Sequence, residues 1–105
     1  MKHSLLRLSI LALLLAIKVT AFGQDFEVDG IAYRITSSST VEVRPKSSGM
    51  YVGNVVIPES ISYKGNTYSV TSIGWGAFYL CNELTSVTIP NSVLIIDNSA
   101  FADCI

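Results

Sequence analysis

The sequence predicts a mostly β fold: a solenoid of short strands and short helical turns stacked coil on coil, with a β-hairpin cap at its N-terminal end. Near the C-terminal end, apolar and aromatic residues recur at a fixed offset of 23 positions, which is typical of stacked repeats. The N-terminal half contains alternating strand patterns joined by glycine turns, and no segment keeps the apolar spacing of a long amphipathic helix. With 105 residues, the chain has room for one domain.

The first 23 residues have the pattern of a secretory signal peptide. Lys2 and Arg7 precede an apolar run over residues 8–17, and small residues follow up to Gly23. This run is shorter than the ~20 residues that a membrane span requires. We therefore expect export, cleavage and no transmembrane span in the remaining chain; an uncleaved N-terminal anchor is the alternative. The mean hydropathy of +0.47 comes in part from this segment.

The remaining residues, 24–105, are acidic and lack histidine. They retain four of the seven basic residues and all eight acidic ones, a net charge of −4, and the only histidine is His3. Without an imidazole the chain cannot itself supply Ser-His-Asp or Cys-His catalysis. Two cysteines alone cannot complete a structural zinc site, and the low basic content disfavours nucleic-acid binding. We expect no enzymatic activity and no cofactor.

Residues 24–69 are predicted to form the cap and a first, degenerate coil. The alternation over residues 26–35 is interrupted by Asp29-Gly30, a pair that tolerates positive φ and is the strongest short signal of a β-hairpin. Further strands are expected over residues 40–44 and 51–57, the second ending at Pro58. A second hairpin is expected over residues 63–68, with its turn at Gly65-Asn66.

Residues 70–105 contain the repeats, of which the second is incomplete. Segments 70–81 and 93–104 match at five positions that lie 23 residues apart. The matched pairs are Val70 with Val93, Ile73 with Ile96, Ala77 with Ala100, Phe78 with Phe101, and Cys81 with Cys104. Residues 57–61 are echoed by residues 89–93 at an offset of 32. The inserted hairpin over residues 63–68 accounts for the longer offset.

Each repeat is predicted to form one coil, whose inward residues are covered by neighbouring coils. Inward positions are expected at Leu84, Val87, Ile89, Val93 and Ile96, and outward positions at Thr85, Ser86 and Thr88. Stacking places Phe78 over Phe101 and Cys81 over Cys104. Short helical turns are expected over residues 77–81 and 100–104.

The two cysteines have two alternative states. An oxidising compartment and an even count favour a disulfide, and the spacing of adjacent coils, ~4.8 Å, lies within its range. However, parallel inward side chains fit a disulfide poorly, and buried cysteine commonly packs as a small hydrophobe. We expect Cys81 and Cys104 to be free, buried thiols.

The spacing of these residues resembles the BspA-type leucine-rich repeat of bacterial surface proteins. The resemblance is carried by Ile73-Gly74, Ala77-Phe78, Cys81, Leu84, Ser86-Val87, Ile89-Pro90 and Ser92-Val93. Residues 26–35 and 63–74 are similar to the cap that precedes such repeats, so the resemblance covers about residues 26–105. One departure is Asp97, which stands where the pattern has glycine. The resemblance implies a secreted or cell-surface protein, similar to adhesins of Bacteroidetes, whose partner is an extracellular protein or glycan.

Two groups of residues are candidate contact surfaces. Trp75 and Tyr79 flank Phe78 and are expected to form an aromatic patch for a protein or glycan, because these residue types carry a large share of interface energy. Packing against the hairpin over residues 63–68 is the alternative. The second candidate is the strand-lined face that carries Thr85, Ser86 and Thr88.

The remaining polar residues offer weaker candidates. Glu83, Asp97 and Asp103 are the nearest approach to paired carboxylates, which serve acid–base catalysis or calcium binding; we expect them on solvated corners. The glycines around Trp75 indicate a turn rather than a phosphate-binding loop, because no lysine follows. Arg34, Arg44 and Lys46 are expected to be ordinary surface charges.

We expect the chain to function in binding, as an adhesion module that is secreted or held at the cell surface. The alternatives are a non-binding cap or spacer of a larger surface protein, and an accessory module of a secreted enzyme. The pattern predicts a further strand after Cys104, and solenoids need at least about three repeats. We therefore expect a truncated product, or edge-to-edge association through an open C-terminal coil that carries Phe101 and Ile105.

Overall fold

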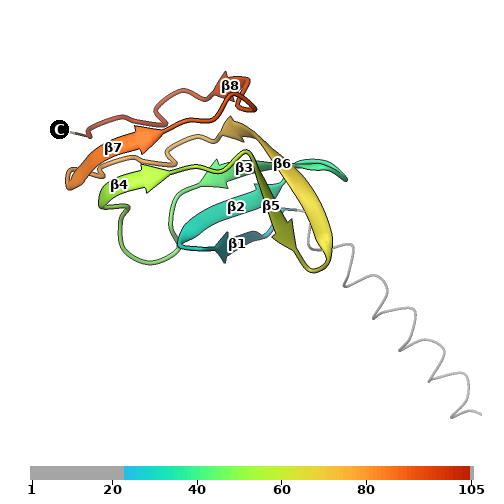
Figure 1. Ribbon diagram of the computed structural model, residues 1–105. Coiled ribbons are helices and arrows are strands. Elements are labelled where there is room, and N and C mark those ends of the chain that lie inside the picture. Colours follow the sequence, from blue (N-terminus) through green and yellow to red (C-terminus); the bar gives the residue numbers. More distant parts are fainter. Residues whose placement is uncertain (1–22, 105) are drawn as a thin grey trace, which may run out of the picture.

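The structure, a computed structural model, describes residues 23–104 (Figure 1). The predicted signal peptide lies outside these residues except for Gly23. The described part of the chain contains short strands joined by turns, as the predicted mostly β class requires. The strands are β1 (Asp25–Val28), β2 (Ile31–Ile35), β3 (Thr40–Arg44), β4 (Gly53–Val56), β5 (Ser60–Tyr63), β6 (Asn66–Ile73), β7 (Leu84–Thr88) and β8 (Ile95–Ile96).

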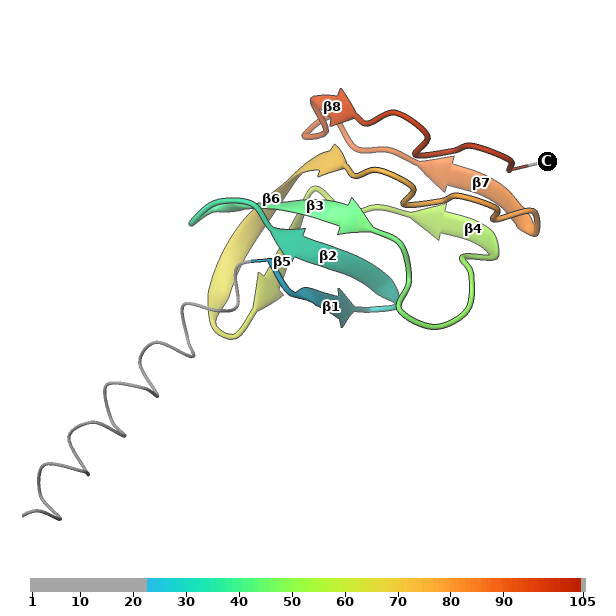
Figure 2. The same ribbon diagram turned by 180° about the vertical axis from the view of Figure 1, so that it is seen from behind.

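Six strands form one sheet in the order β1-β2-β3-β6-β5, and β8 also pairs with β6. Strands β1, β2 and β3 are antiparallel, whereas β3 and β6 are parallel. The first half of β6 pairs with β5 and its end pairs in parallel with β8. Strands β4 and β7 form a separate parallel pair. Figures 1 and 2 show β3, β6 and β8 lying one above another, with the β4–β7 pair at the end of the molecule opposite the β5–β6 turn.

The registers of the parallel strands confirm both repeat offsets. Ser72 pairs with Ile95 and Ile73 with Ile96, which are 23 positions apart. Asn54 pairs with Ser86, and the next two residues of each strand follow in step, at the offset of 32. Parallel pairing of residues one repeat apart is what stacked coils produce.

Both predicted hairpins form, but the turn of the second one differs from the prediction. Asp29 and Gly30 have φ values of 51° and 83°, as a two-residue turn between antiparallel strands requires. In the second hairpin the left-handed residues are Lys64 and Gly65, with φ values of 50° and 81°. Asn66 already pairs with Tyr63 at the start of the ladder, so the predicted turn at Gly65-Asn66 is wrong by one residue.

The short helical turns predicted over residues 77–81 and 100–104 are wrong, because the described residues contain no helix. Each segment is a chain of β-turns, in which Ala77 N donates to Gly74 O and Tyr79 N to Gly76 O. Left-handed residues break any helix: Gly76 and Leu80 have φ values of 67° and 60°. Their counterparts one repeat later, Ser99 and Asp103, have φ values of 61° and 56°.

An aromatic ladder runs through the core. Phe78 is fully buried and its ring stacks on that of Phe101, with centroids 5.0 Å apart and planes at 6°. On its other side lies Tyr51, at 4.7 Å. The predicted stacking of Phe78 over Phe101 is therefore confirmed, and each such pair contributes about 0.5–1.5 kcal/mol beyond the burial of its area. Around the ladder pack the buried residues of β2, β3 and β6.

Two predicted inward residues are exposed. Leu84, Val87 and Val93 pack against the core, but Ile89 is 38% and Ile96 is 51% exposed. Ile73, the counterpart of Ile96, lies between β3 and β8 and is fully buried. Ile96 has β6 on one side, and no described strand pairs with its other side. The expected strand over residues 51–57 is shorter, because Tyr51 instead turns into the core.

Candidate functional site

A hollow of about 220 Å³ lies where the cap meets the first repeat. Its walls are the loop that joins β3 to β4 and the chain of turns over residues 74–81. We call it the junction groove; its principal lining residues are Lys46, Met50, Tyr51, Trp75, Ala77 and Tyr79. Of the predicted site residues, it brings together Trp75 and Tyr79.

The chain of turns explains why two aromatic side chains are displayed here. Trp75 is 62% and Tyr79 is 43% exposed, while Ala77, between them, is buried. Phe78 points the opposite way into the aromatic ladder. Met50, which is 52% exposed, lines the same groove from the loop. Large apolar side chains are thus held at the surface on either side of a buried segment, Gly76 to Phe78.

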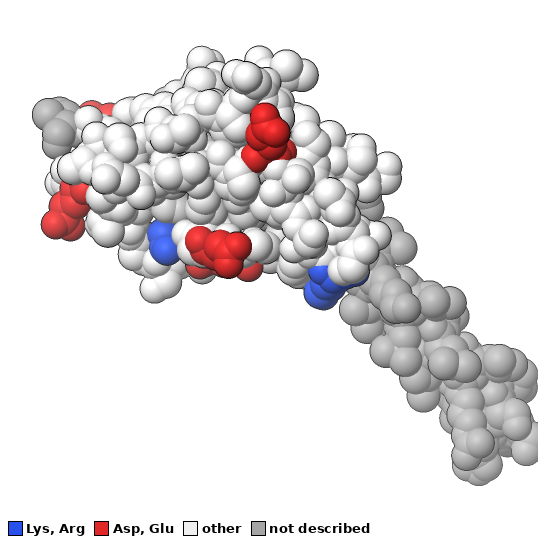
Figure 3. Space-filling model, in the orientation of Figure 1, with Lys and Arg blue, Asp and Glu red and all other residues white. Residues whose placement is uncertain are grey.

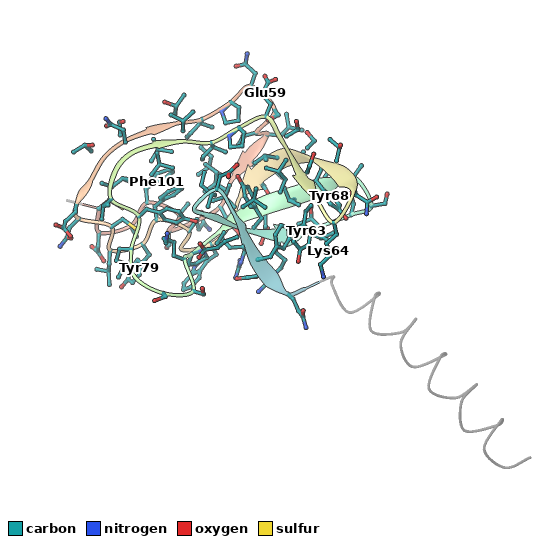
Figure 4. The ribbon with its side chains drawn as sticks, turned by 60° about the horizontal axis from the view of Figure 1, so that its bottom comes forward. Glu59, Tyr63, Lys64, Tyr68, Tyr79 and Phe101 are labelled. Carbon is teal, nitrogen blue, oxygen red and sulfur yellow. The ribbon has the colours of Figure 1, made fainter. Side chains whose placement is uncertain are left out.

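The predicted alternative, packing of the aromatic pair against the second hairpin, is not what the structure shows for Tyr79. Figure 4 places Tyr79 at the end of the molecule away from Tyr63 and Tyr68. Tyr63 is instead stacked on Phe26, with ring centroids 3.7 Å apart.

Tyr51 connects the junction groove to the N-terminal cap. The sequence pattern did not indicate this role. Its hydroxyl accepts a hydrogen bond from Ala32 N at 2.9 Å and donates one to Arg44 O at 2.8 Å. Burial raises the pKa of Tyr51 to about 12. Lys46 Nζ lies 5.5 Å from the centre of the Tyr51 ring and donates to Gly30 O at 3.3 Å. No repeat spacing marks Tyr51, Lys46 or Met50, since all three precede the first clear repeat.

The second candidate surface lies on the β4–β7 pair. Thr85, Ser86 and Thr88 are exposed, as predicted. Thr85 Oγ1 and Ser86 Oγ both donate to Asn54 Oδ1, each at 2.8 Å. A register shift after Gly53 allows two successive residues of β7 to reach one amide. None of these residues lines the junction groove, so the two predicted surfaces remain separate.

The other polar candidates form no site within residues 23–104. Glu83, Asp97 and Asp103 are exposed, and no cluster of metal-ligating side chains occurs in that range. The Asp25 carboxylate pairs with both Arg34 and Arg44, at 2.8 and 3.5 Å. The face in Figure 3 carries a few scattered charges and no continuous basic patch.

Both cysteines are free thiols in the structure, as expected, but Cys104 is only half-buried, whereas both were expected to be buried. Cys81 is buried, and burial raises the pKa of its thiol. Cys104 Sγ donates to Phe78 O, one coil away. Cys81 is therefore not an activated nucleophile, since activation requires a lowered pKa.

Comparison with known proteins gives the family. Residues 51–105 match the model of the BspA type leucine rich repeat region. The chain belongs to the BspA-type leucine-rich repeat family. No protein with a curated description matches it. Within residues 23–104, no helix is long and apolar enough to cross a membrane.

Solved structures of leucine-rich repeat proteins agree with this assignment to the BspA-type family. One from Bacteroides ovatus is 39% identical, with a TM-score of 0.70, over 77% of this chain and 21% of its own. One from Bacteroides capillosus is 31% identical, with a TM-score of 0.63, over 76% of this chain and 59% of its own. A leucine rich cell surface protein from Faecalibacterium prausnitzii, 24% identical over 77% of this chain and 21% of its own, shares the fold with a TM-score of 0.66.

Proposed function

We propose that this chain is an extracellular binding module of a leucine-rich repeat surface protein and that it contacts its partner through the junction groove. The observation that carries the proposal is the exposure of Trp75, Tyr79 and Met50 around one hollow. Exposed aromatic side chains that share a hollow are the usual anchors of binding sites. The partner is an extracellular protein or glycan.

Three further observations support a binding role. The N-terminal pattern of a signal peptide favours export, and a relative of the same fold is described as a cell surface protein. Residues 24–105 contain no histidine, which argues against hydrolytic catalysis by the chain itself. Adhesion to another cell or to its matrix is the form of binding that we propose.

Binding to an array of matrix proteins and glycans tests this function. We expect the purified protein to bind at least one class of ligand, and Trp75→Ala and Tyr79→Ala to weaken that binding. Thr85→Ala and Thr88→Ala serve as matched variants on the second surface. If only these two variants weaken binding, the contact surface lies on the β4–β7 pair; if the array captures nothing, the binding function is wrong.

The apolar strand β8 favours a second role, edge-to-edge association. Leu94, Ile95 and Ile96 are 81%, 64% and 51% exposed, and exposed apolar edge strands promote pairing with other chains. We propose that this edge pairs with another coil. In a solution that contains this chain alone, a second copy of the chain provides that coil. Light scattering after gel filtration should show a concentration-dependent dimer that Ile95→Lys abolishes; a monomer at all concentrations would contradict the proposal.

A further inference from the structure

Neighbouring coils are joined by hydrogen bonds between their chains of turns. Phe78 N donates to Ala100 O at 2.7 Å, and Leu80 N donates to Ala102 O at 3.0 Å. The two donors and the two acceptors are each spaced two residues apart. This arrangement is a short parallel ladder between one coil and the next.

The carbonyl groups one repeat earlier lack the corresponding donors. Ala77 and Tyr79 are the counterparts of Ala100 and Ala102, 23 positions before them. No backbone N–H within residues 23–104 donates to Ala77 O or Tyr79 O. Tyr79 O has only the Cys81 thiol at 3.7 Å, a weak contact. Ala77 is buried, which closes its carbonyl to an incoming chain, whereas Tyr79 is 43% exposed.

The loop between β3 and β4 accounts for the missing donors. It precedes Tyr51, which takes the place of the first aromatic in the ladder. Figure 2 shows this loop arching away from the turns that lead into β7. The junction groove lies in the space between them.

We propose that the junction groove binds an extended polypeptide segment, which donates a backbone hydrogen bond to Tyr79 O and places one bulky apolar side chain in the hollow. The inference rests on the proposed binding function and names its partner. An N–H group of the segment donates to Tyr79 O, as Leu80 N donates to Ala102 O in the next coil. Addition of a strand to unpaired backbone groups is a recurring mode of peptide recognition.

The size and lining of the groove favour a peptide over a glycan. Its 220 Å³ lies below the roughly 300–1,000 Å³ typical of small-molecule pockets and fits a single anchoring side chain. No Asp, Glu, Asn or Gln lines it to pair with sugar hydroxyls. Lys46 is the one charged residue of its lining, so an acidic residue beside the apolar anchor complements the groove.

Trp75, the only tryptophan of the chain, gives a direct optical test. The probes are acetylated octapeptides of serine and threonine, with central Leu, Ile, Met or Phe next to aspartate. We expect at least one to shift Trp75 fluorescence saturably. Methylation of its backbone nitrogens or replacement of aspartate by lysine should weaken binding about tenfold or more. Tyr79→Ala and Met50→Ala should weaken it too, whereas Ile89→Ala, at an exposed site outside both proposed binding surfaces, should not.

The results separate this inference from the proposed function. If no octapeptide shifts the fluorescence, or if backbone methylation has no effect, no peptide N–H donates to Tyr79 O and the inference is wrong. A saturable shift by neutral oligosaccharides such as xylohexaose, without one by peptides, would assign the groove to glycans; the binding function would then stand and the inference would fall.

Discussion

The hydroxyl of Tyr51 accepts a hydrogen bond from the backbone N–H of Ala32 at 2.9 Å, so a side chain of the solenoid caps a strand of the N-terminal sheet. The same hydroxyl donates to Arg44 O, at the end of β3. The ring of Tyr51 meanwhile begins the aromatic ladder through Phe78. One residue thus joins the cap, the first coil and the floor of the junction groove.

Tyr51→Phe should lower the free energy of unfolding by about 1–3 kcal/mol, because it leaves the buried N–H of Ala32 without an acceptor. The midpoint of urea denaturation measures the change. Tyr79→Phe is the matched control, since Tyr79 is partly exposed and no hydrogen bond of its hydroxyl occurs within residues 23–104. Equal midpoints for the two variants would refute the bridging role of Tyr51.

Gly74→Ala should destabilise the fold by about 1–3 kcal/mol, the usual cost of overpacking. A Cβ at Gly74 would lie 2.9 Å from Val43 O, a backbone atom that accepts the hydrogen bond of Gly74 N. Asp97→Asn is the control one repeat later, because Asp97 N donates to Ile73 O in the same way, the residue is exposed, and asparagine keeps the side-chain oxygen that accepts from Asn98 N. Thermal unfolding should show a clear loss for the first variant and almost none for the second.

Ser99→Gly should stabilise the protein by about 0.5–1 kcal/mol. Ser99 has a φ of 61°, a left-handed conformation that costs an L-residue roughly 1–2 kcal/mol. Glycine avoids this cost, but it loses more conformational entropy on folding, which offsets part of the gain. Gly76 occupies the equivalent position one repeat earlier with a φ of 67°. The reciprocal variant Gly76→Ser should destabilise by a similar amount, because its Cβ meets only Tyr79 Cβ at 3.8 Å and no clash adds to the cost. The same sign of change for both variants would contradict the repeat geometry.

Stability should fall at alkaline pH, between about 10 and 12. Burial raises the pKa of both Tyr33 and Tyr51 to about 12, from about 10 in an unfolded chain. The neutral phenols are therefore favoured by folding, and this contribution is complete below pH 10 and is lost as pH rises through 12. Ultraviolet absorbance should show two of the five tyrosines ionising last. Five ionisations near pH 10 in the folded protein would exclude this account.

The parts of the fold that repeat were predictable from sequence. The 23- and 32-residue offsets reappear as the registers of β6 with β8 and β4 with β7, because like residues stack on like in a solenoid. The prediction of helical turns was wrong because Leu80 has a left-handed backbone conformation, which an apolar residue in the sequence does not indicate. The predicted burial of Ile96 was wrong because burial depends on a strand pairing on each side, which the pattern within one repeat does not show.

One wall of the candidate site was predictable from the sequence and the other was not. Trp75 and Tyr79 lie on either side of Ala77 and Phe78, which the repeat assigns to the core, so their position outside the core could be predicted. Met50 and Lys46 belong to a loop without periodicity, and only the fold brings them across from the aromatic pair. Asn54 was missed because its contacts with Thr85 and Ser86 depend on a register shift.

Amide hydrogen exchange of the protein with the strongest ligand from the array tests the central claim, that the junction groove is the contact surface. Bound ligand should slow exchange over residues 45–51 and 75–81, the two walls of the groove, and leave residues 84–88 unchanged. Slowed exchange confined to residues 84–88 would place the contact on the β4–β7 pair and contradict the account.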